Sequence, residues 1–492
     1  MLFLDPARLS EALGVGLPPR VTNVTGVTHD SRRVRPGFAF VAIPGFKRDG
    51  AEFVPAALKA GASLVVAERA VPDAPTAVVP DARSALAALA VALYDDPSSK
   101  MDVHGVTGTN GKTTTSYALH GILAGDYGAE RCGLMSTAEV IIGKERRPAV
   151  HTTPEATAVQ GALRKMLDSG VEHAVMEVSS HGVALRRVAG THFSGALFTN
   201  LTRDHLDLHG SMEEYYAAKR ELFHRATGPK LANVDDAHGR RLAFEVEGVS
   251  TFGAAADADY RVEGVRPAGG GTVFSLRHPS GVLAVESPLL GPYNVENVAG
   301  AAALALALGV EEGVVARAAR GMAQVPGRFE RALPSDDLGF EVVVDYAHTD
   351  VGLEAVLKVA RGIADAGGGR VVCVFGAAGE RDGAKRPLMG RVAARLAEFS
   401  VVTTDDAYGE DPAKISREVA AGAGGGPGRY EIVLDRRAAI RRALEEARSG
   451  DVVVVAGKGH ERVQHLPEGD VQFHDATVVR ELARGLAERK GG

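Results

Sequence analysis

The stretch VHGVTGTNGKTTTSYALHGIL, residues 103–123, decides the fold of the region around it. An apolar strand pattern leads into a glycine-rich turn, and Lys112 and Thr113 then open a helical pattern. In this order, backbone N–H groups of the turn face phosphate groups, the lysine supplies a cation and the threonine hydroxyl can ligate Mg²⁺. The stretch therefore predicts a parallel α/β domain that binds the phosphates of ATP.

This loop departs from the strict spacing G-x-x-x-x-G-K-[ST], because Gly105 falls one residue too early and Val106 takes its place. A glycine-rich turn without a ligand is the alternative. The strand-to-helix setting favours ATP binding. We expect the nucleotide to contact Gly108, Thr109, Asn110, Gly111, Lys112, Thr113 and Thr114.

The composition is that of a folded globular protein, since 45% of the 492 residues are hydrophobic and 24% are charged. This length suggests about three domains. The formal net charge of -6 argues against nucleic-acid binding, which usually needs a basic surface. Only Cys132 and Cys373 are present, so we expect neither a disulfide framework nor a four-ligand zinc site.

The first residues, MLFLDPARLSEALGV, contain Asp5, Arg8 and Glu11 where a signal peptide would be apolar. No apolar run reaches about 18 residues, the length that a membrane span needs. The longest candidate, residues 298–310, is rich in alanine and predicts a buried helix. We therefore expect a cytoplasmic protein without membrane insertion, and our working expectation is a monomer.

Apolar runs that alternate with helical stretches predict an α/β fold of three domains. Residues 1–97 predict a small α/β domain, and residues 98–330 a central ATP-binding domain with a parallel sheet and a hairpin insertion at YRVEGVRP and TVFSLRHP. Residues 331–492 predict a Rossmann-like domain whose strands are EVVVDYAH, RVVCVFG, FSVVTTD and DVVVVAGKG.

Acidic and histidine side chains follow two apolar strands of the central domain. Glu177 ends HAVMEV, and His205 stands in TNLTRDHLDLHG after another apolar run. Side chains at the carboxyl ends of parallel strands can reach a ligand at that edge of the sheet. Each of the two could instead cap a loop, but on neighbouring strand ends they would form a pair of metal ligands.

The next segment predicts an amphipathic helix that begins with the capping-box pair Ser211 and Glu214. Lys219 lies on its apolar stripe. The other members of the stripe are Met212, Tyr215, Tyr216, Leu222, Phe223 and Ala226. A buried ammonium must find a counter-charge, lose its proton or be modified. The alternative is that the lysine extends to solvent.

These residues resemble the Mur ligases of bacterial cell-wall synthesis, in particular the branch that adds the third amino acid to UDP-N-acetylmuramoyl-L-alanyl-D-glutamate. The resemblance covers nearly the whole chain. Its motifs are HDSR (29–32), TGTNGKTTT (107–115), HTTPE (151–155), MEVSSHG (176–182), TRDHLDLHGSMEEYYAAK (202–219), GPYNVENVAGA (291–301), VPGRFE (325–330), DYAHT (345–349), RPLMG (386–390) and GKGHE (457–461).

In that family three domains bind the UDP part of the substrate, ATP and the incoming amino acid. The resemblance implies that CO₂ carbamylates Lys219, which would then hold Mg²⁺ with Thr113, Glu177 and His205, and that Lys112 takes part in catalysis. Further nucleotide contacts would be Asn294, Asn297, Arg328 and Asp345. The uridine nucleotide would meet Ser31, Phe46, Lys47 and Arg48. The muramoyl dipeptide would meet Thr152, Thr153, Ser179 and Arg187, and the amino acid would meet Arg381, Asp405, Asp406, Tyr408, Gly457 and Glu461.

The resemblance also implies the reaction. The γ-phosphoryl group of ATP would pass to the side-chain carboxylate of D-glutamate, with Lys112 and Mg²⁺ stabilising the charge. The amino group of the third amino acid would then attack the acyl phosphate. We expect domain closure to exclude water from this acyl phosphate.

One departure from the family concerns the third amino acid. Enzymes of this branch that take meso-diaminopimelate usually carry DNPR, whose arginine binds the distal carboxylate, but residues 405–408 are DDAY here. The missing cation and the added charge of Asp406 favour a side chain that ends in an ammonium group, as in L-lysine or L-ornithine. The same reaction with meso-diaminopimelate is the alternative.

Two other classes of protein fit parts of the pattern. A related amide ligase such as a folylpolyglutamate synthase would share the ATP site, but the motifs HDSR, HTTPE and GKGHE disfavour it. A non-enzymatic ATP-binding switch would use the fold without catalysis. Because Lys112, Glu177, His205 and Lys219 are present together, we expect an ADP-forming ligase.

Overall fold

A computed structural model describes residues 2–19, 21–45, 48–149, 151–268, 270–333 and 338–491. The chain packs into two compact units. The first contains residues 1–263, 275–285 and 296–319, and the second contains residues 264–274, 286–295 and 320–492.

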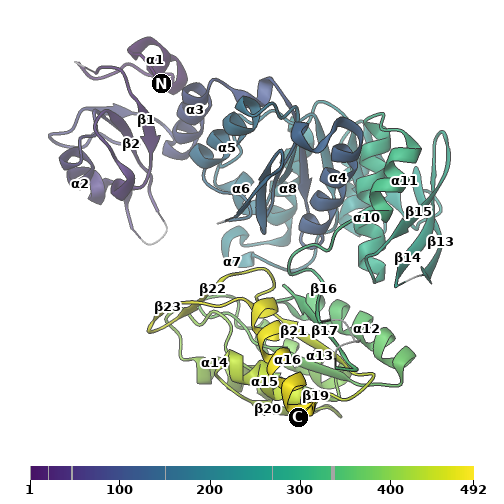
Figure 1. Ribbon diagram of the computed structural model, residues 1–492. Coiled ribbons are helices and arrows are strands. Elements are labelled where there is room, and N and C mark those ends of the chain that lie inside the picture. The colour runs from purple at the N-terminus through teal and green to yellow at the C-terminus, as the bar shows by residue number, and fades with distance from the viewer. Residues whose placement is uncertain are drawn as a thin grey trace. The chain divides into compact units, whose positions relative to one another are not determined.

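A parallel sheet opens the first unit (Figure 1). Its strands pair in chain order, as β1 (Gly26–Thr28), β2 (Phe38–Ala42), β3 (Leu64–Ala67) and β4 (Thr76–Val78). Because side chains alternate along a strand, Val41 packs with α1 (Pro6–Leu13) and α3 (Ala82–Tyr94), whereas Phe40 packs with α2 (Val54–Lys59) on the other face. The predicted small α/β unit is confirmed.

The central sheet carries the phosphate loop on a middle strand, β5 (Asp102–Thr107). Its strand order is β15-β14-β13-β12-β11-β10-β5-β9-β6-β7-β8. The neighbouring strands β12, β11, β10, β5, β9 and β6 run parallel to one another. The other strands are β6 (Cys132–Met135), β7 (Glu139–Ile142), β8 (Glu145–Pro148), β9 (His173–Glu177), β10 (Gly195–Phe198), β11 (Lys230–Asn233), β12 (Val249–Gly253), β13 (Tyr260–Ala268), β14 (Gly271–His278) and β15 (Gly281–Ser287). The predicted parallel sheet is confirmed, with an antiparallel extension at β7 and β8.

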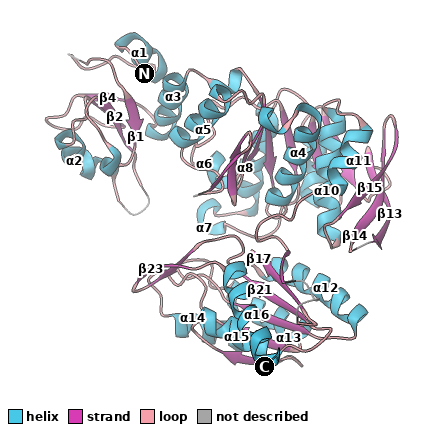
Figure 2. Cartoon of the chain, viewed as in Figure 1, coloured by secondary structure: helices cyan, strands magenta, loops and turns pink. Residues whose placement is uncertain are grey.

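Helices cover both faces of this sheet (Figure 2). Phe198 packs with α8 (Met212–Arg225) on one face, while the neighbouring Leu197 faces Gly300 of α10 (Pro292–Ala307) on the other. The remaining helices are α4 (Lys112–Tyr127), α5 (Ala156–Asp168), α6 (Ser180–Ala184), α7 (Leu206–His209), α9 (Ala237–Glu245) and α11 (Glu312–Arg320). The alanine-rich segment 298–310 is confirmed as mostly buried helix.

The second unit contains a mixed sheet of order β16-β17-β21-β18-β19-β20, in which β16 is antiparallel to β17 and the other pairs are parallel. The strands are β16 (Glu330–Leu333), β17 (Glu341–Asp345), β18 (Val371–Phe375), β19 (Phe399–Val402), β20 (Arg429–Ile432) and β21 (Val452–Ala456). A separate hairpin follows, formed by β22 (Val463–Leu466) and β23 (Gly469–Gln472).

Two hydrophobic cores cover the faces of this sheet. Val343 of β17 packs with α12 (Asp350–Gly367) and α13 (Lys385–Leu396), whereas Val342 and Val344 pack with α15 (Arg436–Glu446) and α16 (Asp475–Gly491). Helix α14 (Pro412–Ala423) packs on α13. This two-sided α/β arrangement confirms the predicted Rossmann-like architecture.

The three sheets agree with three predicted domains, while the boundaries after residues 97 and 330 stay a proposal. In the part of the chain that the structure describes, no helix combines the length and the apolar character that a membrane crossing requires.

Candidate active site

The phosphate loop joins β5 to α4, and two of its glycines have left-handed backbone. Gly108 has a φ of 152°, and a Cβ atom there would lie 1.8 Å from Thr199 Oγ1. Gly111 has a φ of 83°, and a Cβ atom there would lie 2.2 Å from Asn297 Oδ1. Both positions need glycine because the backbone comes so close to neighbouring side chains.

The segment after β10 holds the loop in shape. Thr109 N donates to Asn200 O at 2.8 Å, and Asn110 N donates to Asn200 Oδ1 at 2.9 Å. Thr199 Oγ1 donates to Asn110 O at 2.6 Å. Thr114, a predicted nucleotide contact, is buried in the first turn of α4. Thr199 and Asn200 are not among the predicted residues, because nothing in their local sequence reveals that they lie beside the loop.

Two lysine side chains converge on one carbonyl oxygen of the loop. Lys112 Nζ donates to Gly108 O at 3.0 Å, and Lys219 Nζ donates to the same oxygen at 2.7 Å. Lys219 is 1% exposed on the buried stripe of α8, so the alternative that it extends to solvent is wrong. Burial, together with the charge of Lys112, lowers the pKa of Lys219 well below its ordinary value. Its carbamylation stays a prediction.

Glu177 is fully buried at the end of β9, where two threonines donate to it. Thr113 Oγ1 donates to Glu177 Oε2 at 3.2 Å. Thr137 donates through N to Oε1 at 2.7 Å and through Oγ1 to Oε2 at 3.0 Å. Thr137 Oγ1 also lies 3.1 Å from Thr152 Oγ1. The carboxylate therefore connects the phosphate loop with a residue predicted to bind the muramoyl dipeptide.

His205 does not follow a strand next to that of Glu177, so this prediction is wrong: β5 lies between β9 and β10. His205 has a φ of 53°, and its N donates to Asp204 Oδ1 at 2.9 Å. Burial lowers the pKa of the imidazole, and the charges of Lys112 and Lys219 add to this effect. Among the residues described, no group of three or more His, Cys, Asp or Glu could hold a metal ion.

Three residues predicted for the muramoyl dipeptide meet beside the end of β9. Thr153 Oγ1 donates to Glu177 O at 2.9 Å and accepts from Ser179 N at 3.0 Å. Arg187 donates to Thr153 O at 3.0 Å and forms an ion pair with Glu155 at 2.8 Å. Together with Thr152, they form one cluster, and their role in binding stays a prediction.

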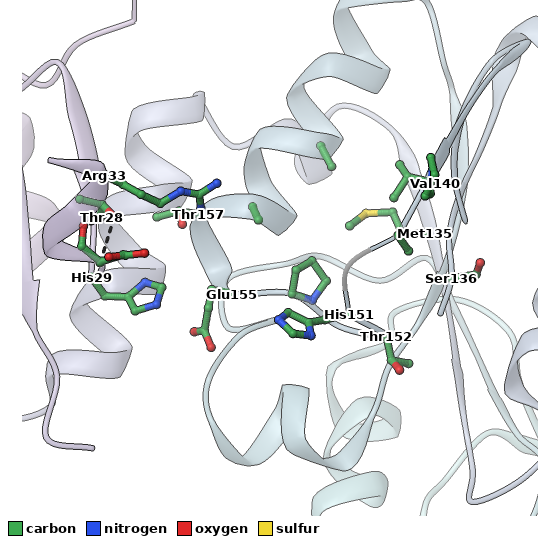
Figure 3. A pocket seen from close by; sticks show the side chains of 16 residues that line it. Thr28, His29, Arg33, Met135, Ser136, Val140, His151, Thr152, Glu155 and Thr157 are labelled. Carbon is green, nitrogen blue, oxygen red and sulfur yellow. Dashed lines mark hydrogen bonds between the residues drawn. The ribbon is translucent and has the colours of Figure 1, made fainter. Parts of the chain in front are cut away.

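A cavity of about 380 Å³ opens beside this cluster in the first unit (Figure 3). Figure 3 shows on one side of it Thr28, His29 and Arg33, on the other side Met135, Ser136 and Val140, and between them His151, Thr152 and Glu155. Burial lowers the pKa of His29. The cavity thus joins the motifs HDSR and HTTPE, which are far apart in the sequence.

Of the four residues predicted for the uridine nucleotide, Ser31 and Arg48 belong to the described part of the chain, and Ser31 adjoins this cavity. Ser31 follows the lining residues His29 and Asp30 directly. Arg48 forms an ion pair with Glu52 at 3.0 Å. Phe46 and Lys47 lie outside the described residues.

Two asparagines predicted to contact the adenine lie on α10. Asn297 Oδ1 accepts from Thr115 Oγ1 at 3.3 Å, which ties it to the first turn of α4 behind the phosphate loop. Asn294 Nδ2 donates to Leu290 O at 2.8 Å. The contact of Asn297 with the loop agrees with a nucleotide site, and the adenine contacts stay predictions.

In the second unit, Asp345 anchors the loop that carries Arg328. Asp345 Oδ2 accepts from Phe329 N at 2.6 Å, and Oδ1 accepts from Ala347 N at 2.7 Å. Burial raises the pKa of Asp345. The guanidinium of Arg328 lies 4.4 Å from the ring centroid of Tyr346. Asp345 thus fixes backbone around Arg328, a role that the sequence did not indicate.

Asp405 and Asp406 belong to a buried charge network. Lys458 is 0% exposed, and its Nζ lies 2.8 Å from both Asp406 Oδ1 and Glu461 Oε2. Although burial alone would lower the pKa of Lys458, the charges of Asp405, Glu461 and Asp406 raise it. A Cβ atom at Gly457 would lie 2.3 Å from Asp405 Oδ2. Since Asp406 already has a cation, its charge is no longer a reason to expect an ammonium group of the substrate there.

Tyr408 lies beside a predicted and an unpredicted basic residue. The guanidinium of Arg381 lies 5.6 Å from its ring centroid. The ring of His465 stacks on it with centroids 5.2 Å apart and planes 12° apart. His465 is not predicted because it belongs to the hairpin β22–β23, which carries no motif.

Left-handed backbone at non-glycine residues marks much of the predicted site. In the part of the chain described, eight such residues occur. Three form turns near the small sheet, but five are predicted site residues or precede or follow one. These five are Arg186, His205, Phe329, Glu380 and Tyr408. Such conformations cost energy and concentrate at functional sites, so they support the predicted positions without reference to any motif.

A fully buried ion pair supports the end of β21. Arg436 donates to both carboxylate oxygens of Asp475, at 2.8 and 2.7 Å, and both side chains are 0% exposed. Arg436 Nη2 also donates to Ala456 O at 2.9 Å. The pair thereby joins α15 and α16 to the strand end that leads to Gly457.

The fold and the site define a phosphate-loop α/β enzyme that uses ATP. Residues 23–98 match the Mur ligase family, catalytic domain; residues 106–305 match the Mur ligase middle domain; residues 327–459 match the Mur ligase, glutamate ligase domain. The chain belongs to the Mur ligase family and is therefore a ligase.

Named relatives cover almost the whole chain. The UDP-N-acetylmuramoyl-L-alanyl-D-glutamate--2,6-diaminopimelate ligase of Solibacter usitatus is 42% identical over 94% of this chain and 94% of its own length. A solved structure of a ligase of the same name has a TM-score of 0.67 and 31% identity, over 97% of this chain and 99% of that one. The MurF ligase of Thermotoga maritima, solved in complex with ADP, shares the fold with a TM-score of 0.63 and 19% identity, over 94% and 98% of the two chains.

Proposed function

We propose that this ligase uses ATP to add 2,6-diaminopimelate to UDP-N-acetylmuramoyl-L-alanyl-D-glutamate, in the synthesis of peptidoglycan precursors. Two relatives that carry this activity in their names support the proposal. The predicted preference for L-lysine or L-ornithine has no such support, and pairing of Asp406 with Lys458 removes part of its physical reason. We also propose that the enzyme acts in the cytoplasm, where ATP is available.

The observation that carries the proposal is the convergence of Lys112 and Lys219 on Gly108 O, next to the contact between Thr113 and Glu177. The Lys112 ammonium at this point of the phosphate loop suits a transition state whose negative charge spreads over phosphoryl oxygens. Burial lowers the pKa of Lys219, and the closeness of Lys112 lowers it further. A buried neutral amine is the form that can react with CO₂.

The donor set at Glu177 fits Mg²⁺, which prefers oxygen ligands. The Thr113 hydroxyl and the Glu177 carboxylate are 3.2 Å apart, and Thr137 holds the carboxylate in place. We propose that Thr113, Glu177, His205 and the carbamate of Lys219 would hold the ion. When bound, it would neutralise charge on the phosphates.

In the first chemical step, Lys112 stabilises the γ-phosphoryl group while the bond between its phosphorus and the bridging oxygen breaks. ADP leaves, and the phosphorus bonds to a carboxylate oxygen of the D-glutamate residue. The cluster of Thr152, Thr153, Ser179 and Arg187 would orient the dipeptide that carries this carboxylate. Such positioning makes a major contribution to the rate of this kind of reaction.

In the second step, the amino group of the third amino acid attacks the acyl carbon. The bond from that carbon to the phosphate oxygen breaks, and the amine passes a proton to the leaving phosphate as the amide forms. Glu461, which Lys458 and Tyr346 hold through hydrogen bonds of 2.8 and 3.3 Å, would bind this amino group. A carboxylate fixed in this way can orient an ammonium group.

The test is phosphate release from ATP with UDP-N-acetylmuramoyl-L-alanyl-D-glutamate, offering meso-diaminopimelate, L-lysine and L-ornithine separately. We expect release that depends on the nucleotide substrate and is fastest with meso-diaminopimelate. The variant Lys112→Met is the control and should release almost none. No release with any of the three amino acids would refute the proposed reaction, whereas release only with a monocarboxylate would refute the amino acid alone.

A further inference from the structure

Three side chains that can donate to an anion gather at one point of the second unit. Tyr408 lies at the centre, with the ring of His465 stacked on it and the guanidinium of Arg381 near its ring. Asp470 Oδ1 lies 2.7 Å from His465 Nδ1. We call Arg381, Tyr408 and His465 the donor stack.

The backbone is bent to form the donor stack. Tyr408 has a φ of 50°, and Glu380, directly before Arg381, has a φ of 50° as well. Tyr408 N donates to His465 O at 3.1 Å, which joins the loop after β19 to the hairpin β22–β23. Strained backbone of this kind persists only where the surrounding structure enforces it, and it is commonest at binding sites.

The carboxylates of Asp405 and Asp406, which lie next to the donor stack, are buried and not accessible to a substrate. Asp406 is 5% exposed, and its Oδ1 accepts from both Lys458 Nζ, at 2.8 Å, and His465 N, at 2.9 Å. Asp405 is 6% exposed and accepts from Asp406 N at 2.7 Å. The accessible basic side chains beside Tyr408 are those of Arg381, which is exposed, and of His465, whose side chain is 38% exposed. The exposed carboxylate of Glu380 accepts from Gly409 N at 3.3 Å on the same loop.

One ring nitrogen of His465 remains for a ligand. Its Nδ1 contacts Asp470, and within the described part of the chain Nε2 has no hydrogen-bond partner. A carboxylate has two oxygens that accept several hydrogen bonds, and bonds to a charged acceptor are stronger than neutral ones. The Arg381 guanidinium and the Tyr408 hydroxyl supply donors of the kind that a carboxylate needs. Because Nδ1 of His465 already donates to Asp470, its Nε2 adds a further donor when the imidazole carries both protons.

We infer that the donor stack binds a carboxylate at the far end of the third amino acid's side chain, and that His465, held by Asp470, is a specificity-determining residue. The inference rests on the proposed function. An amino acid that ends in an ammonium group would meet the positive charge of Arg381, and like charges in a binding site disfavour the wrong ligand. The ligand class is thus a diamino acid with a second carboxylate.

The experiment compares kcat/KM for meso-diaminopimelate and for L-lysine in variants of the whole enzyme, with saturating ATP and nucleotide substrate. His465→Ala removes the donor, and His465→Arg keeps a cation. Val471→Ala is the matched control, because Val471 is exposed on the same hairpin and takes no part in the donor stack. Thermal unfolding of each variant checks that it folds.

We expect His465→Ala to lower kcat/KM for meso-diaminopimelate by about ten- to a hundredfold, mainly by raising KM. A loss of this size corresponds to one hydrogen bond to a charged group. L-lysine should change by less than about threefold. His465→Arg should restore much of the loss, and Val471→Ala should match the wild type.

Equal losses for both amino acids would overturn the inference, because they would give His465 a structural role only. So would an unchanged value for meso-diaminopimelate. If the wild-type enzyme used L-lysine but not meso-diaminopimelate, the inference would fall while the ligase reaction stood. If no amino acid supported phosphate release, the proposed function itself would fall, so the two failures are distinguishable.

Discussion

Gly108 contributes to the phosphate loop through both its backbone oxygen and its missing side chain. Its carbonyl accepts from Lys112 and Lys219, and its φ of 152° brings it within reach of Thr199. A methyl group at this position would collide with the Thr199 hydroxyl and would strain the backbone. The residue therefore fixes the positions of two lysine side chains.

We expect Gly108→Ala to lower ATP-dependent phosphate release by at least about a hundredfold, because a shift of about 1 Å at a reacting group has effects of this size. Gly121→Ala is the matched control. A Cβ atom at Gly121, in the middle of α4, would have no atom within 4 Å. It should keep full activity and raise the free energy of unfolding by about 0.5–1 kcal/mol.

Activity assays and urea unfolding of the two variants check this prediction. If Gly108→Ala retained normal phosphate release, the close approach to Thr199 would have no functional meaning. A similar loss in both variants would point to a general effect on the fold of α4.

At the scale of elements, α8 carries an ionisable residue, Lys219, on its buried apolar stripe. Burial and the charge of Lys112 lower the pKa of Lys219. Between that lowered pKa and the ordinary value of 10.5, the unfolded chain binds a proton that the folded chain does not. Stability therefore rises with pH in this window.

We expect the free energy of unfolding of the wild type, relative to that of Lys219→Met, to increase with pH by up to about 1.4 kcal/mol per unit in this window. Urea unfolding of both proteins between neutral and alkaline pH, in buffer freed of CO₂, measures the difference. A difference that stays constant with pH would contradict a lowered pKa. Arg220→Met, a more exposed change on the same helix, is the control and should show no such trend.

Most elements follow from local sequence, because a buried parallel strand is an apolar run of a few residues and a helix shows its period. The strands β5, β9, β10 and β11 and the buried stripe of α8 are examples. The same patterns indicated Lys112, Glu177 and Lys219, which stand at strand or helix ends or on a stripe.

The contacts of the site could not be predicted in this way. Thr137 bonds to Glu177 across 40 positions of sequence, and Lys458 pairs with Asp406 across 52. The prediction that Glu177 and His205 follow neighbouring strands is wrong because it depends on strand order. Nothing in the local sequence indicates that β5 lies between β9 and β10. The sequence presents Tyr408 as one position in a motif, whereas packing brings Arg381 and His465 beside it.

At the scale of the whole molecule, each compact unit has hydrophobic cores of its own. Domains with separate cores often unfold in separate steps. The phosphate loop belongs to the first unit, so a nucleotide that binds there stabilises this unit directly. Ligand binding to the folded state raises the free energy of unfolding by about 2.7 kcal/mol at a hundred times Kd.

We expect thermal unfolding to show more than one transition, and Mg²⁺ with ADP to raise the temperature of the transition of the first unit. Calorimetry with and without the nucleotide measures both. Lys112→Met is the control and should lose the shift while keeping the transitions. A single transition that ADP does not move would argue against both the separate units and the nucleotide site.

The buried pair of Arg436 and Asp475 has a consequence for how the sequence can change over time. Loss of either partner leaves a charge without compensation in the interior, at a cost of about 3–5 kcal/mol, whereas replacing both with apolar residues can be nearly neutral. Any lineage that abandons the pair must therefore cross a severely destabilised intermediate or change both codons together. We expect the two positions, 39 residues apart, to be kept together or replaced together. Other positions of α15 and α16 can change independently of them.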